Sequence, residues 1–310
     1  WILESLAPSL EAMTDLPRAE RDALAERFTL SEAEEATVAR SQDGTVKHVW
    51  RLGDGEFVES VLIPTEKRLT LCISSQAGCA TVSRSADGTA KHLWRLADGE
   101  LVESVLIPTS DRLTLCLSSQ AGCAMGCTFC ATGWGGFRRQ LSAGEIVAQY
   151  RASRRWAEAN GLGPITNIVY MGMGEPLANR AAVHDSLSIL NRGYEVGARR
   201  ITVSTVGLVP GILELAERPE QFRLALSLPA PESDLRQSLI PLERRDPLPE
   251  VMEARVRVDE AGGKRITFEY TMIAGVNDAP ELIEPLADLA RQVGAFVNLI
   301  PFNPIPYQDW

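Results

Sequence analysis

From Leu113 onward the sequence alternates short apolar runs with stretches of helical periodicity, and this alternation constrains the fold more than any other feature. The runs are rich in β-branched residues, as strands of a buried parallel sheet are. Ser142 and Glu145 have the spacing of a capping box and open the first helix. The predicted strands are Leu113–Ser118, Ile165–Met171, Arg200–Ser204, Arg223–Ser227, Arg265–Met272 and Phe296–Ile300. Six such units predict an α/β fold, an incomplete parallel (βα)6 barrel, with its active site at the carboxyl ends of the strands.

A tandem repeat precedes the barrel. Residues 37–80 align with residues 81–124 at an offset of 44, and 35 of the 44 positions are identical. Each copy has the pattern of a strand, an Asp-Gly turn and a strand; in the first copy the predicted strands are Lys47–Leu52, Phe57–Ile63 and Leu69–Ile73. Two copies are fewer than the roughly three that a solenoid needs. A recent in-frame duplication or an error in assembling the gene sequence explains the repeat more simply.

These patterns divide the chain into four parts. We expect a helical remnant over residues 1–36, the first copy of the β-hairpin segment over 37–80, the second copy over 81–112 and the partial barrel over 113–310. The sequence begins at Trp1 rather than at Met, and it stops at Trp310 directly after a Pro-rich loop. We therefore expect a fragment, truncated at both ends.

Three cysteines, Cys123, Cys127 and Cys130, follow the first barrel strand with the spacing C-x3-C-x2-C. Three thiolates in one tight loop can hold three corners of a cubane iron–sulfur cluster and leave the fourth iron open. The alternatives are a zinc knuckle without its fourth ligand and a chance cluster of core cysteines. Zinc loops usually supply their ligands in pairs, and no second pair follows here. The spacing favours the open cluster.

Composition narrows the class of protein. All six cysteines lie between Cys72 and Cys130, which suits reduced thiols in a cytoplasm rather than a disulfide framework. No apolar run approaches the ~20 residues of a membrane span. The formal net charge of −10 argues against avid nonspecific nucleic-acid binding. Five arginines after the cysteines form a candidate local RNA patch, although solvated helix charge explains the last three equally well. They are Arg138, Arg139, Arg151, Arg154 and Arg155.

The unusual residues of the barrel region follow its predicted strands. The cysteine loop follows the first strand, the segment from Gly172 to Pro176 the second, and the segment from Thr205 to Gly207 the third. Pro229 follows the fourth strand and Asn303 the sixth. Taken singly, each small polar residue is equally well explained as a strand-end turn. Together they predict one functional face.

With its cluster loop, this pattern resembles the radical S-adenosylmethionine enzymes, and within them the dual-specificity RNA methyltransferases that act on adenine C2 of 23S rRNA and tRNA. Nearly the whole chain apart from the extra repeat copy shares the resemblance. The matching stretches begin at Glu103 (ESVLIP), Leu115 (LCLSSQAGC), Tyr170 (YMGMGEPL), Val203 (VST) and Leu299 (LIPFNP).

The resemblance implies a 4Fe–4S cluster held by Cys123, Cys127 and Cys130, with S-adenosylmethionine bound to its open iron. Further positions match the cofactor contacts of the family: Gly174, Glu175, Ser204, Ser227, Leu228, Pro229 and Asn303. A glycine there allows a close approach of the cofactor to the backbone. The family usually has His at the position of Pro229, so any side-chain contact at that position is lost.

Glu103 and Cys116 match the proton-accepting carboxylate and the resolving cysteine of the family. Without the resemblance, Cys116 would be interpreted as a small buried hydrophobe. The implied relay also uses a C-terminal cysteine that carries the methyl group and then forms a transient disulfide with the resolving cysteine. No cysteine follows Cys130. We expect truncation to account for this, so that the chain binds its cofactors but does not turn over methyl groups.

The resemblance also implies the partners. These are 23S rRNA and tRNA as substrates and an electron donor such as flavodoxin, for a monomeric cytoplasmic enzyme without membrane association. Two alternatives remain open. One is the related resistance-type enzyme that methylates adenine C8, and the other is a catalytically dead product of duplication and truncation.

Overall fold

The structure is a computed structural model that describes residues 34–40, 46–51, 57–64, 69–73, 79–260 and 266–303. The chain divides into two compact units, Trp1–Ala77 and Gly78–Trp310. Most of the predicted helical remnant over residues 1–36 lies outside the described residues. Its last three residues belong to strand β1, so the prediction of a helix is wrong there.

The described part of the first unit is an antiparallel sheet formed mainly by the first repeat copy. Its strands follow one another in the order β1-β2-β3-β4, and the predicted strands of this copy are confirmed at β2, β3 and β4. The strands are β1 (Glu34–Arg40), β2 (Val46–Arg51), β3 (Phe57–Pro64) and β4 (Leu69–Ile73).

The second copy folds with the same strand register as the first. Lys47 pairs with Val61 in the first copy, and Lys91 pairs with Val105 in the second, 44 residues later. Both copies also carry a bulge at the same place in their first strand. The pairing is therefore encoded in the repeat itself. The strands of the second copy are β5 (Cys79–Arg84), β6 (Ala90–Arg95), β7 (Leu101–Pro108) and β8 (Leu113–Cys116).

The second unit extends this antiparallel sheet into the predicted parallel one. Strand β8 pairs antiparallel with β7 and parallel with β11, so the described sheet runs in the order β15-β14-β13-β12-β11-β8-β7-β6-β5. The six predicted barrel strands are confirmed within two residues at each end, and all of them are parallel. They are β8, β11 (Asn167–Tyr170), β12 (Ile201–Thr205), β13 (Arg223–Ser227), β14 (Ile266–Met272) and β15 (Phe296–Pro301).

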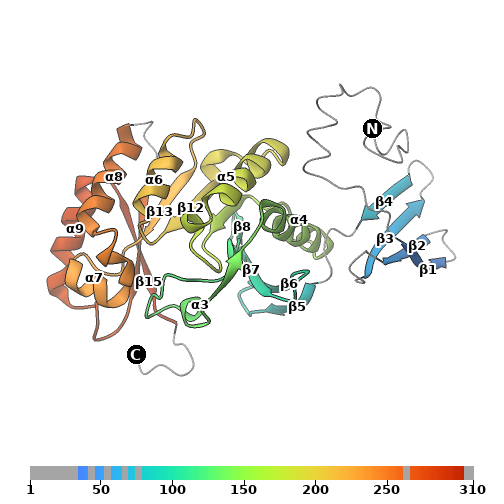
Figure 1. Cartoon of the computed structure of the whole chain (residues 1–310), viewed down its shortest axis with the longest axis horizontal. Helices are drawn as coiled ribbons and strands as arrows, with labels where there is room; N and C mark the ends of the chain where they lie inside the picture. The colour runs from blue at the N-terminus through green and yellow to red at the C-terminus, as the bar shows by residue number, and fades with distance from the viewer. Residues whose placement is uncertain are drawn as a thin grey trace. The chain divides into compact units, whose positions relative to one another are not determined.

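Helices alternate with these strands as expected for an incomplete (βα)6 barrel. Figure 1 shows α4, α5, α6, α8 and α9 following one another along the sheet, with the short α3 apart from that row. The helices are α3 (Ala131–Trp134), α4 (Ala143–Ala159), α5 (Arg180–Ser188), α6 (Val209–Ala216), α7 (Ser233–Leu239), α8 (Leu248–Glu260) and α9 (Ile283–Gln292). A small hairpin and short helical turns complete the described unit: β9 (Gln120–Gly122), β10 (Phe137–Gln140), η1 (Pro176–Ala178), η2 (Ile189–Gly193), η3 (Ala198–Arg200), η4 (Pro241–Arg244) and η5 (Pro280–Leu282).

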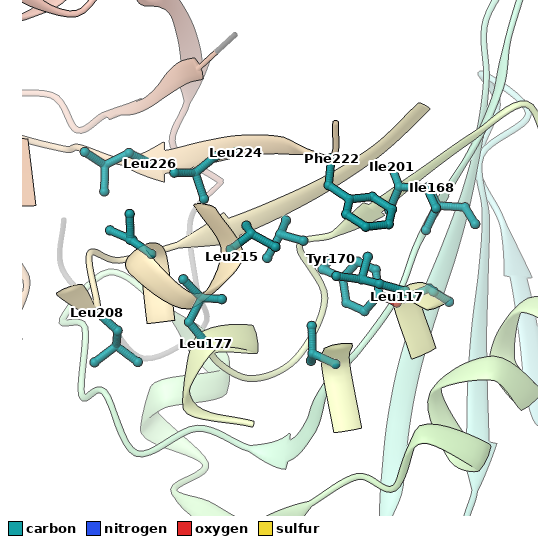
Figure 2. Packing of buried hydrophobic residues seen from close by; sticks show 14 of the residues in the cluster. Leu117, Ile168, Tyr170, Leu177, Ile201, Leu208, Leu215, Phe222, Leu224 and Leu226 are labelled. Atoms are coloured by element: carbon teal, nitrogen blue, oxygen red, sulfur yellow. The ribbon is translucent and has the colours of Figure 1, made fainter. Parts of the chain in front are cut away.

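The hydrophobic core lies between the sheet and these helices. On β12, Ile201, Val203 and Thr205 are buried, whereas the alternate residues are only half-buried, so one set of side chains faces the helices and the other faces the barrel interior. Figure 2 shows the buried side chains of three neighbouring strands together with those of the segments that cover them. The labelled residues include Ile168, Tyr170, Ile201, Leu224, Leu226, Leu208, Leu215 and Phe222. No helix among the described residues is long and apolar enough to cross a membrane.

Helix α4 shows one confirmed prediction and one contact that the sequence did not reveal. The capping box of α4 is present, with Ser142 accepting from the backbone of Glu145 and the Glu145 carboxylate accepting from the backbone of Ser142. On its inner face α4 packs against the second repeat copy. His92 lies 4.8 Å from the Trp156 ring, and its Nδ1 is 3.2 Å from Ser153 Oγ.

His92 makes the stability of this unit depend on pH. Burial lowers the pKa of His92 from 6.5 to about 4. Because the pKa is lower in the folded than in the unfolded state, the stabilisation is complete above about pH 6.5 and is lost as the pH falls towards 4. We expect a loss on the order of 2–3 kcal/mol in unfolding free energy from this site. Denaturant titrations between pH 4 and 7 should show this slope in wild type and not in His92→Asn; equal slopes would contradict the assignment.

Candidate active site

A cavity of about 230 Å³ opens where the parallel strands end. Its wall includes Ser204 and Thr205 of β12, Ser227 of β13, and Glu269 and Thr271 of β14. These residues stand at or near the carboxyl ends of their strands. The structure thus confirms that residues following several strands gather on one face, as the alternation of strands and helices predicts.

The three cysteines line this cavity together. Cys123 and Cys127 are buried and Cys130 is half-buried. The loop is held by hydrogen bonds from Cys123 N to Gly136 O at 3.1 Å and from Cys130 N to Cys127 O at 3.2 Å. All three side chains therefore reach a common space.

The charge environment of the loop disfavours bare thiolates. Burial raises the pKa of Cys127 to about 12, and the charges of Cys130, Cys123 and Glu175 raise it further. Burial also raises the pKa of Cys123. Three soft donors in one cavity fit three iron corners of a cubane cluster, whose positive irons stabilise the deprotonated form. In the part of the chain that the structure describes, no three His, Cys, Asp or Glu side chains are placed to hold a single metal ion.

The loop after β11 also lines the cavity. Gly174 has φ +95°, and a Cβ atom there would lie 2.4 Å from Cβ of Gln120. The Gln120 side chain accepts a hydrogen bond from the backbone of Glu175 at 2.7 Å. Both the left-handed backbone and the close packing therefore require glycine at this position.

Glu175 joins two strand-end loops. Its Oε1 accepts from Leu177 N and its Oε2 from Val206 N, both at 2.9 Å. The side chain is buried, and burial raises its pKa to about 7, against hydrogen bonds from Val206, Leu177 and Thr205 that lower it. The backbone of Glu175 is engaged as well, because its N–H donates to Gln120 Oε1 at 2.7 Å and its carbonyl accepts from Ala178 N at 3.1 Å, so this residue fixes the shape of the loop.

The remaining predicted cofactor residues divide into two groups. Ser204 and Ser227 line the cavity with the cysteines, Gly174 and Glu175. Leu228 is fully buried and donates its N–H to Glu269 O at 3.0 Å. Pro229 is buried, and its carbonyl accepts from Asn277 Nδ2 at 2.7 Å. Leu228 and Pro229 therefore do not line the cavity. Asn303 is exposed and does not line it either.

Sequence reasoning missed Glu269 and Thr271 of β14 as cavity residues. The strand alternates buried Ile266, Phe268 and Tyr270 with half-buried polar residues. Asn298 Nδ2 donates to Glu269 Oε2 at 2.7 Å, and burial raises the pKa of Glu269. Along β14, polar residues alternate with buried apolar ones, which places the polar side chains on the barrel interior. This alternation is the sequence pattern that could have identified Glu269.

Glu103 lies in a second cavity, of about 340 Å³, which shares Thr132 with the first. Lys91 Nζ is 3.0 Å from Glu103 Oε1, and both side chains are partly exposed. Arg138 lines the same cavity. The structure therefore places Glu103 beside the cysteine cavity rather than inside it.

Cys116 is buried at the end of β8 and is not among the residues lining either cavity. Burial raises the pKa of its thiol to about 12, although a hydrogen bond from the backbone of Met171 lowers it. Among the described residues, Cys116, Cys123, Cys127 and Cys130 are free, and no disulfide is seen.

Two of the five arginines in the candidate patch are engaged in ion pairs. Arg139 pairs with Asp98 and with Glu145, the latter at 2.8 Å, and Arg154 pairs with Glu158 one helical turn away at 2.9 Å. The second pair supports the interpretation of α4 charge as a solvated helix face. Arg138, beside Glu103, is the member of the set that the structure places at a described cavity.

Fold and site together define the class of protein. A parallel sheet with a three-cysteine loop at its carboxyl end is the arrangement of the radical SAM enzymes, and residues 117–286 match the family model described as the Radical SAM superfamily. Membership implies a 4Fe–4S cluster and S-adenosylmethionine as cofactors.

The chain belongs to the family of the dual-specificity RNA methyltransferases RlmN. It is 54% identical to a probable dual-specificity RNA methyltransferase RlmN of Gemmatimonas aurantiaca, over 96% of this chain and 69% of that protein. It is 44% identical to the dual-specificity RNA methyltransferase RlmN of Anaeromyxobacter dehalogenans, over 99% of this chain and 72% of that one. A crystal structure of a radical SAM methyltransferase from Sphaerobacter thermophilus is similar, with a TM-score of 0.70, 42% identity, and coverage of 100% of this chain and 78% of that chain.

Gly174→Ala tests the cavity wall. The new Cβ would meet Gln120 and force a left-handed alanine, at a cost of about 1–2 kcal/mol. Because the family resemblance places S-adenosylmethionine against this residue, we expect about tenfold weaker cofactor binding by calorimetry on the anaerobically reconstituted protein. Gly197→Ala is the matched control, since its φ is −54° and nothing lies within 4 Å of the added Cβ. Equal affinity in the two variants would contradict the assignment.

Proposed function

We propose that the protein methylates C2 of an adenosine in 23S rRNA and in tRNA by a methyl-cysteine relay. The observation that carries the proposal is that Cys123, Cys127 and Cys130 share one cavity with Gly174 and Ser204. The relatives named dual-specificity RNA methyltransferases support RNA as the substrate and methyl transfer as the reaction.

In this proposal each wall of the cavity has a separate task. Cys123, Cys127 and Cys130 hold the cluster, which with S-adenosylmethionine supplies the radical chemistry when bound. The loop around Gly174 and Glu175 orients the cofactor and excludes water. The other orienting residues in the proposal are Ser204 and Ser227, which line the cavity, and Leu228, Pro229 and Asn303, which lie outside its lining.

Glu103 and Cys116 act on the RNA side. The carboxylate of Glu103 accepts the proton that the methylated adenine must lose, and Lys91 at 3.0 Å positions it. Cys116 resolves the protein–RNA adduct, and its burial keeps it a neutral thiol until the adduct reaches it. We assign no residue of the sequence to the methyl-carrying thiol, since no cysteine follows Cys130.

The shared Thr132 supports this division of labour. It lines both cavities, so a base held beside Glu103 would be adjacent to a cofactor held beside the cysteines. We propose that the enzyme works as a monomer in the cytoplasm and receives electrons from a flavodoxin-like donor. The confinement of all six cysteines to residues 72–130 suits reduced thiols rather than a disulfide framework and supports that compartment.

The repeat offers a matched pair of cysteine variants to test cluster binding. Cys79 is the counterpart of Cys123 in the first copy and lies 44 residues before it. After anaerobic reconstitution with iron and sulfide, we expect about four irons per chain in wild type and in Cys79→Ala, and reductive release of 5′-deoxyadenosine by both. Cys123→Ala and Cys127→Ala should lose both properties. A wild-type chain without a cluster, or a Cys127→Ala variant that keeps it, would contradict the proposal.

The methylated adenosine that is produced distinguishes the proposed function from the two alternatives. Mass mapping of adenosine from RNA treated with a chain that carries the complete relay should find the 2-methyl isomer. The 8-methyl isomer would assign the chain to the resistance-type enzymes, and the absence of any 5′-deoxyadenosine from the reconstituted wild-type chain would mark it as catalytically inert.

A further inference from the structure

The segment formed by α7 and η4 packs against the cysteine loop. Thr128, next to Cys127, donates its backbone N–H to Leu239 O at 3.0 Å. A Cβ on Gly126 would lie 3.9 Å from Pro241 Cγ. This segment carries two buried charged side chains that the proposed mechanism does not use, Arg236 and Glu243.

Arg236 is completely buried, and Glu243 is 4% exposed. The Nη1 atom of Arg236 pairs with Glu243 Oε2, and its Nη2 donates to Val206 O at 2.6 Å. Glu243 Oε1 in turn accepts from Leu248 N at 3.0 Å. Replacing a buried ion pair by apolar residues often leaves the stability of a folded protein unchanged or increases it. The Arg236–Glu243 pair beside the cysteine loop therefore needs an explanation other than stability.

The third nitrogen of this guanidinium has no hydrogen-bond partner in the part of the chain that the structure describes. Nε of Arg236 is buried and makes no hydrogen bond to any group among the described residues. Burial lowers the pKa of Arg236 to about 10, and the negative charges of Cys127 and Asp246 raise it. The side chain is therefore a cation at neutral pH, and it is close enough to Cys127 to interact with its charge.

We propose that Arg236 is a positioning residue that sets the reduction potential of the cluster bound at Cys127. Three thiolates leave a 4Fe–4S cluster with net negative charge, and one added electron increases that charge. A fixed cation in a buried site stabilises the reduced form more than the oxidised form and raises the potential. Glu243 holds the guanidinium in place and offsets part of its field.

The hydrogen bond to Val206 connects this cation to the cofactor wall. Val206 accepts from Arg236 through its carbonyl and donates its N–H to Glu175 Oε2 at 2.9 Å. Gly207 follows directly, and a Cβ there would lie 3.0 Å from Arg236 Nη2. One side chain therefore contacts the β12 loop while its charge acts on a cluster ligand.

The test is a redox titration of the reconstituted full chain, followed by electron paramagnetic resonance of the one-electron-reduced cluster. Arg236→Gln is made in a Glu243→Gln background, so that no buried carboxylate is left unpaired. The double variant is compared with the Glu243→Gln single variant. Its cluster should have an equilibrium constant for reduction about tenfold lower, which corresponds to a reduction potential about 59 mV more negative. Glu243→Gln alone should shift the potential upwards from wild type.

Arg244→Gln in the same Glu243→Gln background is the matched control. Arg244 is exposed on η4, so solvent screens its charge and we expect no shift from its removal. Equal potentials for the double variant and the Glu243→Gln single variant would overturn the proposal. Loss of iron from the Arg236 variant but not from the Arg244 variant would also overturn it, because Arg236 would then hold the loop rather than tune the cluster. A wild-type chain that binds no cluster would refute the cofactor assignment instead.

Discussion

The buried carboxylate of Glu175 is the interaction on which the site depends. It accepts hydrogen bonds from Leu177 and Val206, which lie in the loops after β11 and β12, and its own backbone N–H is held by Gln120 of β9. Strand β9 and the segments after β11 and β12 are thereby fixed against one another. Since unpaired N–H groups are costly in a buried site, the loops are stable only together. Glu175 and Val206 line the cavity together with the three cysteines.

Much of this fold was predictable from sequence because the physical signals are local. Apolar, β-branched runs separated by helical stretches predict parallel strands, and the carboxyl-end rule then places the cysteine loop beside Gly174 and Ser204. The identical register of the two repeat copies shows the same principle, since alternation and turn geometry fix strand pairing. Only the second copy continues into β11, because the rest of the barrel follows that copy in the chain.

What escaped the sequence depends on contacts between distant residues. The resemblance could not reveal that Cys116 is buried away from both cavities, or that Pro229 binds Asn277 through its carbonyl. Arg139 was a candidate for RNA contact, but Asp98 from the repeat and Glu145 from α4 bind it. The role of Arg236 likewise depends on a loop more than a hundred residues earlier in the chain, and no local pattern marks it.

The central claim is that three cysteines hold a cluster with one iron left open for S-adenosylmethionine. Mössbauer spectroscopy of protein reconstituted with iron-57 tests it most directly, because the spectrum distinguishes irons by their ligands. Adding S-adenosylmethionine should change the isomer shift of one iron and leave the signals of the remaining irons in place. A spectrum in which every iron stays equivalent after the addition would contradict the claim.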